Sequence, residues 1–421
     1  MKNLTWQNPE QLFVAQELIN KVKSKCCGIK DIKLTYHFYQ KYCYILPYVL
    51  IRNYLRIYTN WFILYTKNIY TKIKMNVYIF FYCFILILLL SDFCIKRQRN
   101  IALAILGTIV ILFVGLRGET GADSQNYIDF FNFQTNTFYK WEEINKGYAE
   151  YGFYFLSVLL KTIYNNIDFY FLVIAAITTI PLIKSLNYMC IYPVLGYCVY
   201  YSRFMIIRDM NQIRQALAIA LIIYGLRFLI ENKKKLFWII TVICISLHYS
   251  MIIIIPFIYL YNLKLNFKQC IFLIISGGVI GIIGGYILKA ILIATNNIVL
   301  LRYVNTMNLG IFNPVLIFQC VICLIFFYYE PIISLQQKGY YIIRNAYLYS
   351  VILLLLTCNL GEIGGRLATV FATCEIFILP ALSCVVKPRI AGYIISLALT
   401  ALLFFMNYMK LIQESYLWSY F

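Results

Sequence analysis

Charged residues are scarce in this chain, and acidic residues are scarcer than basic ones. Only 13% of the 421 residues are Asp, Glu, Lys or Arg, whereas 62% are hydrophobic, and the mean hydropathy is +0.74. A soluble domain has about 25% charged residues and about 45–50% apolar ones. This chain therefore has too little polar surface to cover itself in water. The composition excludes an ordinary soluble protein and indicates a membrane protein with the lipid bilayer as its main partner.

Residues that bind metals or act as nucleophiles are also few. The chain has two histidines, His37 and His248, so a site built from several histidines is excluded. Cys320 and Cys323 are spaced as CxxC inside an apolar run, but no second pair completes a zinc site. The lack of a Gly-x-Ser-x-Gly elbow argues against a serine hydrolase. We therefore expect no metal and no other cofactor.

The basic residues are numerous but clustered. A formal net charge of +20 is compatible with nucleic-acid binding. However, the lysines and arginines gather between apolar runs, for example at 94–100, 231–237 and 386–390. Such clusters are typical of cytoplasmic loops and not of a basic groove. We expect no nucleic-acid partner.

The first 74 residues differ from the rest of the chain. Residues 1–74 are mostly polar, and their apolar stretch at 44–65 is interrupted by Arg52 and Arg56. No cleavable signal peptide with a small-residue cleavage site begins at residue 1. Met75 then opens a clean apolar run. Two interpretations are open: 1–74 is a small extension, or translation starts at Met75 and the functional domain is 75–421. We favour the second.

Apolar runs of the length that crosses a bilayer recur after Met75. Backbone hydrogen bonds must close internally in lipid, so helices are expected for such segments. The prediction is an all-α, polytopic membrane protein with about 10–12 transmembrane helices. The segment 151–164 is shorter and fits a re-entrant element. The expected spans are 76–93, 100–116, 168–184, 193–207, 213–230, 236–260, 270–290, 314–329, 345–360, 367–385 and 391–408.

The basic loops predict the orientation. If 94–100 faces the cytoplasm, the acidic-leaning loop 117–150 faces outside. The same rule places 202–212 and 359–366 outside. The alternation of inside and outside loops is not consistent along the whole chain. One element between 262 and 313 is therefore expected not to cross the membrane.

The first candidate site follows the second span. Arg117 is followed by Glu119 and Asp123 in a glycine-rich loop. A guanidinium offers a planar fork suited to phosphate. The simpler interpretation is that Arg117 extends to the interface and pairs with Glu119.

The second candidate site opens a long apolar helix. Arg203, Arg208, Gln212 and Arg214 crowd its start. Arg208, Gln212 and Gln215 are three or four residues apart and share one helix face. Polar residues at membrane depth are candidates for function. Interhelical hydrogen bonds with flanking interfacial charges are an equally good interpretation.

Two further candidates lie near the ends of later spans. His248 lies well inside an expected span, where it either faces a cavity or is a hydrogen-bonded packing residue. Arg366 opens a span after a glycine-rich turn, and Glu375 follows inside that span.

The predicted topology brings several arginines to the outer boundary of the membrane. They oppose the usual bias of positive charge toward the cytoplasm. Arginines in that place suit an anionic ligand such as a diphosphate carried on a lipid. No DxD-like acidic pair points to a bound metal, so arginine is expected to hold the leaving-group charge. These residues are Arg117, Arg203, Arg208, Arg214 and Arg366.

The same segments resemble the EpsG family of polytopic membrane proteins, relatives of the Wzy-type O-antigen and capsule polymerases. Arg117, Gly121, Asp123 and Tyr127 match that family's arginine, Gly-x-Asp and tyrosine pattern. The chain departs from the pattern at Gly118 and Ser124, where aromatic residues are common. Further matching segments extend the resemblance from Met75 to the C-terminus, at 150–160, 210–229, 247–257 and 365–380.

The resemblance implies a polymerase of bacterial exopolysaccharide, capsule or O-antigen in the inner membrane, acting on polyprenyl-diphosphate-linked glycans. A flippase and a chain-length regulator of the same pathway are the implied protein partners. Arg117, Arg208, Arg214 and Arg366 are then expected to hold the diphosphate, together with Tyr127 and Gln212 in substrate binding. Either Asp123 or His248 serves as the base. The alternatives are a transporter or flippase of the same lipids and a non-catalytic scaffold.

Overall fold

The computed structural model describes residues 77–140, 147–294, 310–360 and 362–417. Within these ranges all regular structure is helical, which confirms the predicted all-α membrane fold. The chain divides into two compact units, Met1–Val77 and Tyr78–Phe421, and only the second is treated below. The extension 1–74 and the expected start at Met75 lie outside the described residues, so the division at Met75 stays a prediction.

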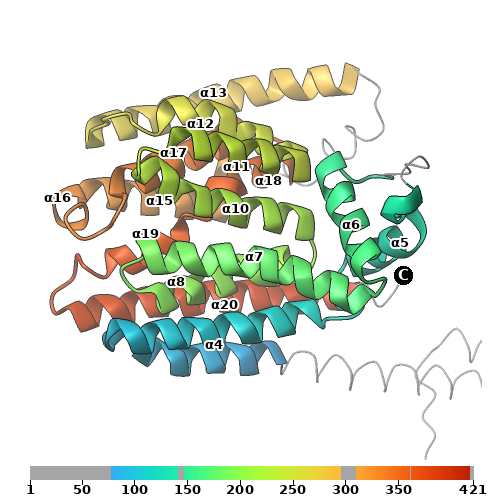
Figure 1. Cartoon of the computed structure of the whole chain (residues 1–421). Helices are drawn as coiled ribbons and strands as arrows, with labels where there is room; N and C mark the ends of the chain where they lie inside the picture. The colour runs from blue at the N-terminus through green and yellow to red at the C-terminus, as the bar shows by residue number, and fades with distance from the viewer. Residues whose placement is uncertain (1–76, 141–146, 295–309, 361, 418–421) are drawn as a thin grey trace, which may run out of the picture. The chain divides into compact units, whose positions relative to one another are not determined.

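Five helices of the described ranges are long and apolar enough to cross a membrane, and a bent pair makes up to six. The bent pair is α18 (Glu362–Ala372) and α19 (Glu375–Leu382), whose axes differ by 53°. The long helices, shown in Figure 1, are α4 (Lys96–Gly115), α7 (Ile167–Met189), α10 (Ile213–Ile230), α13 (Phe267–Ala294) and α20 (Arg389–Leu417).

Shorter helices account for the remaining apolar runs. They are the stretch Val77–Phe93, which ends in η1 (Leu89–Phe93), α6 (Tyr151–Ile163), α8 (Pro193–Tyr200), α11 (Lys234–Leu247), α12 (Ile254–Leu260), α15 (Pro314–Tyr328) and α17 (Tyr340–Leu356). Short elements connect them: α5 (Ser124–Asp129), η2 (Phe130–Gln134), η3 (Phe138–Lys140), η4 (Tyr201–Met205), α9 (Ile206–Arg208), η5 (Tyr249–Ile253), η6 (Gly310–Phe312) and α16 (Glu330–Ile333).

One expected span is wrong. The run 236–260 is two helices, because α11 ends at Leu247 and His248 takes an extended conformation with φ −156° and ψ 113°. The break is stabilised from outside the run, since Glu150 accepts hydrogen bonds from the Tyr249 N–H and contacts the His248 ring. The expectation that one element between 262 and 313 does not cross falls partly on residues 295–309, outside the described residues, and stays a prediction.

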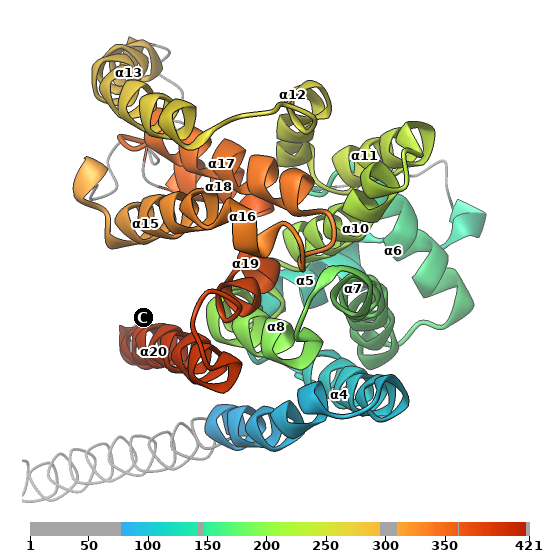
Figure 2. The same ribbon diagram turned by 90° about the vertical axis from the view of Figure 1, so that its left-hand side faces the viewer.

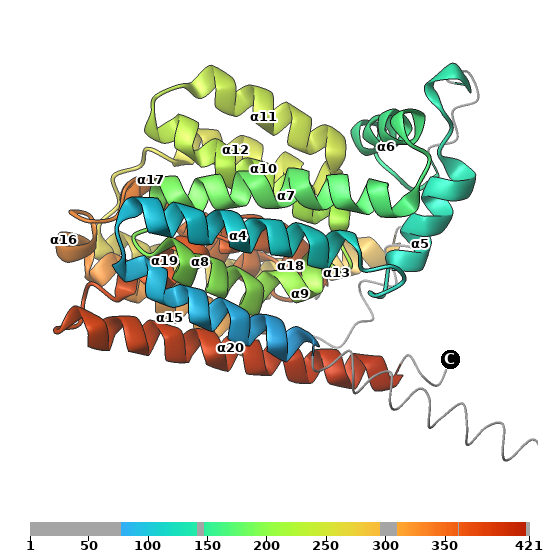
Figure 3. The same cartoon turned by 60° about the horizontal axis from the view of Figure 1, so that its bottom comes forward.

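The loops of the second unit gather at two ends, visible in Figures 1 and 3. One end carries the starts of α4, α11 and α20 with their lysines and arginines, and we call it the basic end. The other end carries α5, α6, the start of α10 and the end of α11, and we call it the loop end. The segments expected inside and outside the cell thus lie at opposite ends.

Helix α10 forms the centre of the helix packing. It contacts α7, α11 and α17, as the view along the helices in Figure 2 shows, and most of its residues are buried. Helices α13 and α17 approach closely at Gly281, where an added Cβ would lie 2.0 Å from the Leu355 carbonyl oxygen. Small residues permit such close helix contacts in membranes. The packing places the polar ends of α10 and α11 beside the loop that precedes α6.

Candidate functional site

A buried carboxylate joins three elements at the loop end. Glu150 lies just before α6 and is 6% exposed. Its Oε2 forms an ion pair with Arg214, in the first turn of α10, and its Oε1 lies 2.9 Å from Nδ1 of His248. Tyr148 adds a ring 4.9 Å from the Arg214 guanidinium. We call Glu150, Arg214, His248, Tyr127 and Tyr148 the Glu150 cluster.

The ends of helices bring these side chains together. A cation at a helix N-terminus opposes the helix dipole, so Arg214 at the start of α10 needs the carboxylate of Glu150 to offset it. Burial alone raises the pKa of Glu150. The hydrogen bond with His248 and the charge of Arg214 outweigh that effect and hold the pKa of Glu150 below its usual value. Glu150 is therefore ionised at neutral pH.

Two of the predicted residues lie at the edge of this cluster. Tyr127 on α5 is buried, and its ring centre is 6.4 Å from that of Tyr148. Burial raises the pKa of Tyr127, and the nearby Arg214 only partly opposes this. Asp123 precedes α5 and acts electrostatically on both tyrosines. Its carboxylate has no hydrogen-bond partner within the ranges that the structure describes.

A second polar region is a cavity of about 240 Å³ between α9, α15, α17 and α18. We call it the arginine cavity. Its apolar lining includes Phe204, Val315 and Leu354. Its polar lining consists of Arg203, Arg208, Gln212, Asn313, Gln319 and Thr369.

The bent pair α18–α19 holds the two arginines of this cavity. Arg208 is 3% exposed and donates from Nη1 to Thr373 Oγ1 at 2.8 Å and from Nη2 to Thr369 Oγ1 at 2.6 Å. Arg203 forms an ion pair of 3.3 Å with the fully buried Glu375, which also accepts a hydrogen bond from Tyr347. Residues on both sides of the bend between α18 and α19 thus supply the acceptors that keep both guanidinium groups at the cavity.

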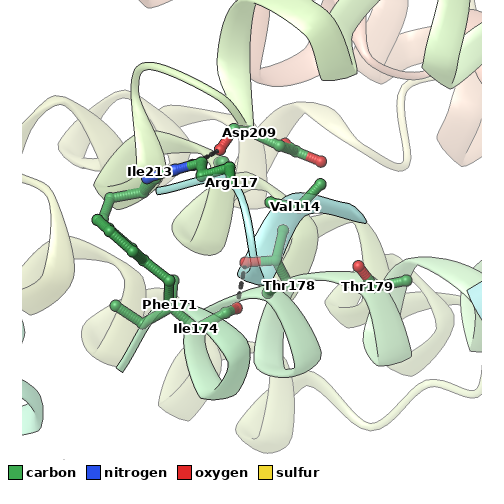
Figure 4. A pocket seen from close by; sticks show the side chains of 10 residues that line it. Val114, Arg117, Phe171, Ile174, Thr178, Thr179, Asp209 and Ile213 are labelled. Atoms are coloured by element: carbon green, nitrogen blue, oxygen red, sulfur yellow. Dashed lines mark hydrogen bonds between the residues drawn. The ribbon is translucent and has the colours of Figure 1, made fainter. Parts of the chain in front are cut away.

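Arg117 follows α4 and is buried, and Figure 4 shows its side chain beside Asp209. Its Nη1 donates to the carbonyl oxygen of Asp209, and its guanidinium lies 4.3 Å from the ring centre of Phe171. Burial lowers the pKa of Arg117 to about 10, so it stays charged at neutral pH. Glu119 is exposed, and Arg117 bonds to Asp209 and not to it.

A small cavity adjoins Arg117. Its volume is about 10 Å³, close to the room that one water molecule needs. Thr178 and Asp209 are among the residues that line it (Figure 4). The buried Nε and Nη2 of Arg117 have no hydrogen-bond partner among the described residues. Arg117 thus retains donors that the fold does not use.

Arg366 is exposed near the start of α18, beside Gly365 of the arginine cavity. Its carbonyl oxygen accepts a hydrogen bond of 2.9 Å from Gln215, one of the glutamines expected in apolar surroundings. Apart from Arg117, the predicted residues therefore fall into two groups. Arg214, His248, Tyr127 and Asp123 surround the Glu150 cluster, whereas Arg208, Gln212 and Arg366 surround the arginine cavity.

Sequence reasoning missed the residue that organises the first group. Glu150 was one of several acids in the loop 117–150. Its signal was its place directly before the apolar run 151–164, where a carboxylate has little access to water. Asn313 and Gln319 of the arginine cavity were also missed, and a buried Gln inside the apolar α15 was their signal. Within the ranges described, no three His, Cys, Asp or Glu side chains gather as a metal site.

Comparisons with known proteins identify the family of this chain. The family model described as "EpsG family" matches residues 100–421. The amylovoran biosynthesis protein AmsC of Erwinia amylovora is 27% identical over 186 residues, which are 42% of this chain and 48% of that protein. The chain thus matches about half the length of that relative. No solved structure matches the chain. Because the family model covers most of its length, this protein belongs to the EpsG family.

Proposed function

We propose that this protein is a polymerase that joins polyprenyl-diphosphate-linked oligosaccharide repeat units during exopolysaccharide, capsule or O-antigen synthesis. Family membership supports the proposal, and the relative in amylovoran biosynthesis supports a biosynthetic role. The observation that carries it is the pairing of two sites across one short turn. Arg208 lies on the arginine cavity and Arg214 lies on the Glu150 cluster.

The arginine cavity suits the donor. Arg203, Arg208 and Gln212 offer donors to a diphosphate, and Phe204 with Val315 offers an apolar wall to a lipid chain. Arg366 lies at the edge of the cavity. There it is proposed to contact the diphosphate on the side that carries the glycan. Arg117 reaches the same turn through the Asp209 carbonyl, and its unused donors add positive charge there.

The Glu150 cluster suits the acceptor. A base removes the proton of an acceptor hydroxyl, and the oxygen attacks the anomeric carbon of the donor. The bond from that carbon to the diphosphate oxygen breaks, and its electron pair leaves with the diphosphate. Asp123 and His248 are the two candidate bases, while Arg214 and Tyr127 are the proposed contacts to the sugar.

Arginine supplies the positive charge that the departing diphosphate needs, so we propose that the transferase acts without a metal. The bacterial inner membrane is the proposed location because lipid-linked repeat units and a basic cytoplasmic end belong there. A flippase that delivers the lipid and a regulator of chain length are the proposed protein partners.

A transporter or flippase of the same lipids is the second candidate. The bent pair α18–α19 favours it, because discontinuous helices commonly carry transporter binding sites. A non-catalytic scaffold is a third possibility, and it alone requires neither arginine site.

Purified full-length protein in lipid vesicles, given polyprenyl-diphosphate-linked repeat units alone, separates these functions. The polymerase forms glycan chains longer than one repeat unit, whereas a transporter moves the lipid without forming polymer. Arg208→Ala should lower polymer formation by about 100-fold or more, as removal of a charged transition-state donor does. Arg97→Ala, which removes an exposed arginine at the basic end, is the matched control. Failure of the wild-type protein to form polymer would reject the assignment.

A further inference from the structure

We propose that Glu150 is the residue that positions His248 as the base of the transfer reaction, with Arg214 holding Glu150 from the opposite side. The proposal rests on the polymerase function and decides between the two bases that the motif pattern leaves open. Glu150 touches neither reacting atom in this scheme, so it is a positioning residue, and His248 is the catalytic residue.

The two oxygens of Glu150 have different partners. Oε1 lies 2.9 Å from His248 Nδ1, and Oε2 is paired with Arg214. An ionised carboxylate only accepts hydrogen bonds. In a neutral imidazole the proton must therefore be on Nδ1, which leaves the lone pair on Nε2. A carboxylate that fixes a histidine in this way sets both its tautomer and its ring orientation.

The position of His248 in the chain makes that lone pair accessible. The residue lies in the break between α11 and η5, at the loop end, with its side chain 19% exposed. Nε2 has no hydrogen-bond partner among the described residues. Exposed Tyr148 and Tyr249 lie beside Glu150, where they offer flat faces to a sugar ring. With its side chain partly exposed at the loop end, His248 is proposed to receive the acceptor hydroxyl at Nε2.

A close helix contact fixes the separation of Glu150 and His248. Gly152 lies two residues after Glu150, and Ser246 lies two residues before His248. A Cβ on Gly152 would lie 2.7 Å from the Ser246 carbonyl oxygen. Only glycine allows α6 and α11 to approach so closely, so this contact determines the distance between the carboxylate and the imidazole.

Asp123 lacks a comparable arrangement. It precedes α5 without capping that helix through its side chain, and no described residue orients its carboxylate. A base must be held within hydrogen-bond reach of the proton that it removes. His248 meets that requirement through Glu150, and Asp123 does not.

The transfer moves one proton and exchanges one bond at the anomeric carbon. The acceptor hydroxyl gives its proton to His248 Nε2 while its oxygen bonds to the anomeric carbon of the donor. The bond between that carbon and the diphosphate oxygen breaks, and the lipid diphosphate leaves with the electron pair. The imidazolium, facing the charges of Glu150 and Arg214, then returns its proton to water.

Polymer formation in vesicles tests the chemistry. We expect His248→Gln to lower kcat by about 100-fold or more, the usual contribution of a general base, and Asp123→Asn to lower it by less than about 10-fold. Glu150→Gln should lower kcat with little change in KM. Glu150→Asp should restore part of the rate, and Glu119→Gln, an exposed acid of the same loop, should have no effect.

A spectroscopic measurement tests the positioning without polymer formation. His37→Gln leaves His248 as the single imidazole of the full-length chain. Nitrogen-15 spectra of labelled histidine should then show the proton on Nδ1, and Glu150→Gln or Gly152→Ala should remove that preference. An unchanged tautomer in both variants, or an Asp123→Asn loss equal to that of His248→Gln, would overturn the proposal. Wild-type protein that shows this tautomer but forms no polymer would reject the polymerase assignment and leave the positioning by Glu150 supported.

Discussion

Two buried arginines at opposite ends of the helix packing differ in how the fold uses them. Arg344, on α17 at the basic end, is 1% exposed, and all three of its guanidinium nitrogens donate hydrogen bonds. Its partners are Glu330, Asn345 and the Leu263 carbonyl oxygen. Arg117, at the loop end, is 7% exposed and uses only Nη1.

The difference distinguishes an arginine that stabilises the fold from an arginine whose donors stay available for function. A buried polar group without a partner destabilises the folded state. Arg344 avoids that cost because the loop before α13 and the start of α16 supply its acceptors. Arg117 retains two donors that no described residue accepts, beside a small cavity. Unused donors at a motif residue fit a group kept for function.

The largest expected effect is the loss of stability on removal of Arg344, whose guanidinium nitrogens all donate hydrogen bonds. Arg344→Ala leaves Asn345 Oδ1 and the partly exposed Glu330 carboxylate without their donor, and losing a hydrogen bond to a charged group costs about 1.5–3 kcal/mol. We expect little monodisperse protein in detergent and a strongly lowered thermal midpoint. Arg227→Ala, which removes a less buried arginine at the same end, is the control. A normal yield for Arg344→Ala would show that the two buried arginines do not differ as described.

Arg117→Met should show the opposite profile. Methionine fills a similar volume and removes the two unsatisfied donors, so the free energy of unfolding should change by no more than about 1 kcal/mol. Polymer formation should fall by at least about 10-fold, because the turn that carries Arg208 loses its contact with Arg117. Thermal unfolding and the vesicle assay measure the two effects. Equal losses of stability in this variant and in Arg344→Ala would remove the distinction.

The stability of the loop end should decrease at low pH, because protonation of Glu150 removes its contribution. The pKa of Glu150 in the folded protein lies below its unfolded value of about 4.3. Its contribution is therefore complete above that unfolded value and is lost as the pH falls through the lower folded value. Thermal midpoints of the wild type and Glu150→Gln should differ by a few degrees at pH 7 and converge as the pH falls below the lowered pKa of Glu150 in the folded protein. A difference that persists in acid would mean that the Arg214 and His248 contacts do not stabilise the charged form.

The same comparison shows what could be predicted from the sequence. Composition predicted the helical membrane fold, because long apolar segments transfer from water into lipid. The charged loops predicted the two ends, because charged residues stay in water. The arginines near 208 were found because polar residues at the start of an apolar helix are costly. The break at His248 was not found, because Glu150 stabilises it from 98 positions away in the chain. Arg117 was found from the motif, but its burial against Phe171 was not, because no local pattern links the two residues.

Two glycines of the Arg117 loop provide the smallest and sharpest test. Gly121 has φ +120°, and an added Cβ would lie 2.2 Å from the Met210 carbonyl oxygen, whereas Gly118 has φ +57° and open space around it. The next residue, Ala122, donates to Asn211, so the loop is attached to the turn that carries Arg208. Gly118→Ala should cost only its left-handed backbone strain, about 1 kcal/mol, and leave polymer formation unchanged. Gly121→Ala should lower polymer formation severalfold, because the added methyl group pushes the Arg117 loop away from the turn that carries Arg208. Equal activity in the two variants would show that this attachment serves the fold alone, and Arg117 would then have to act on substrate by another route.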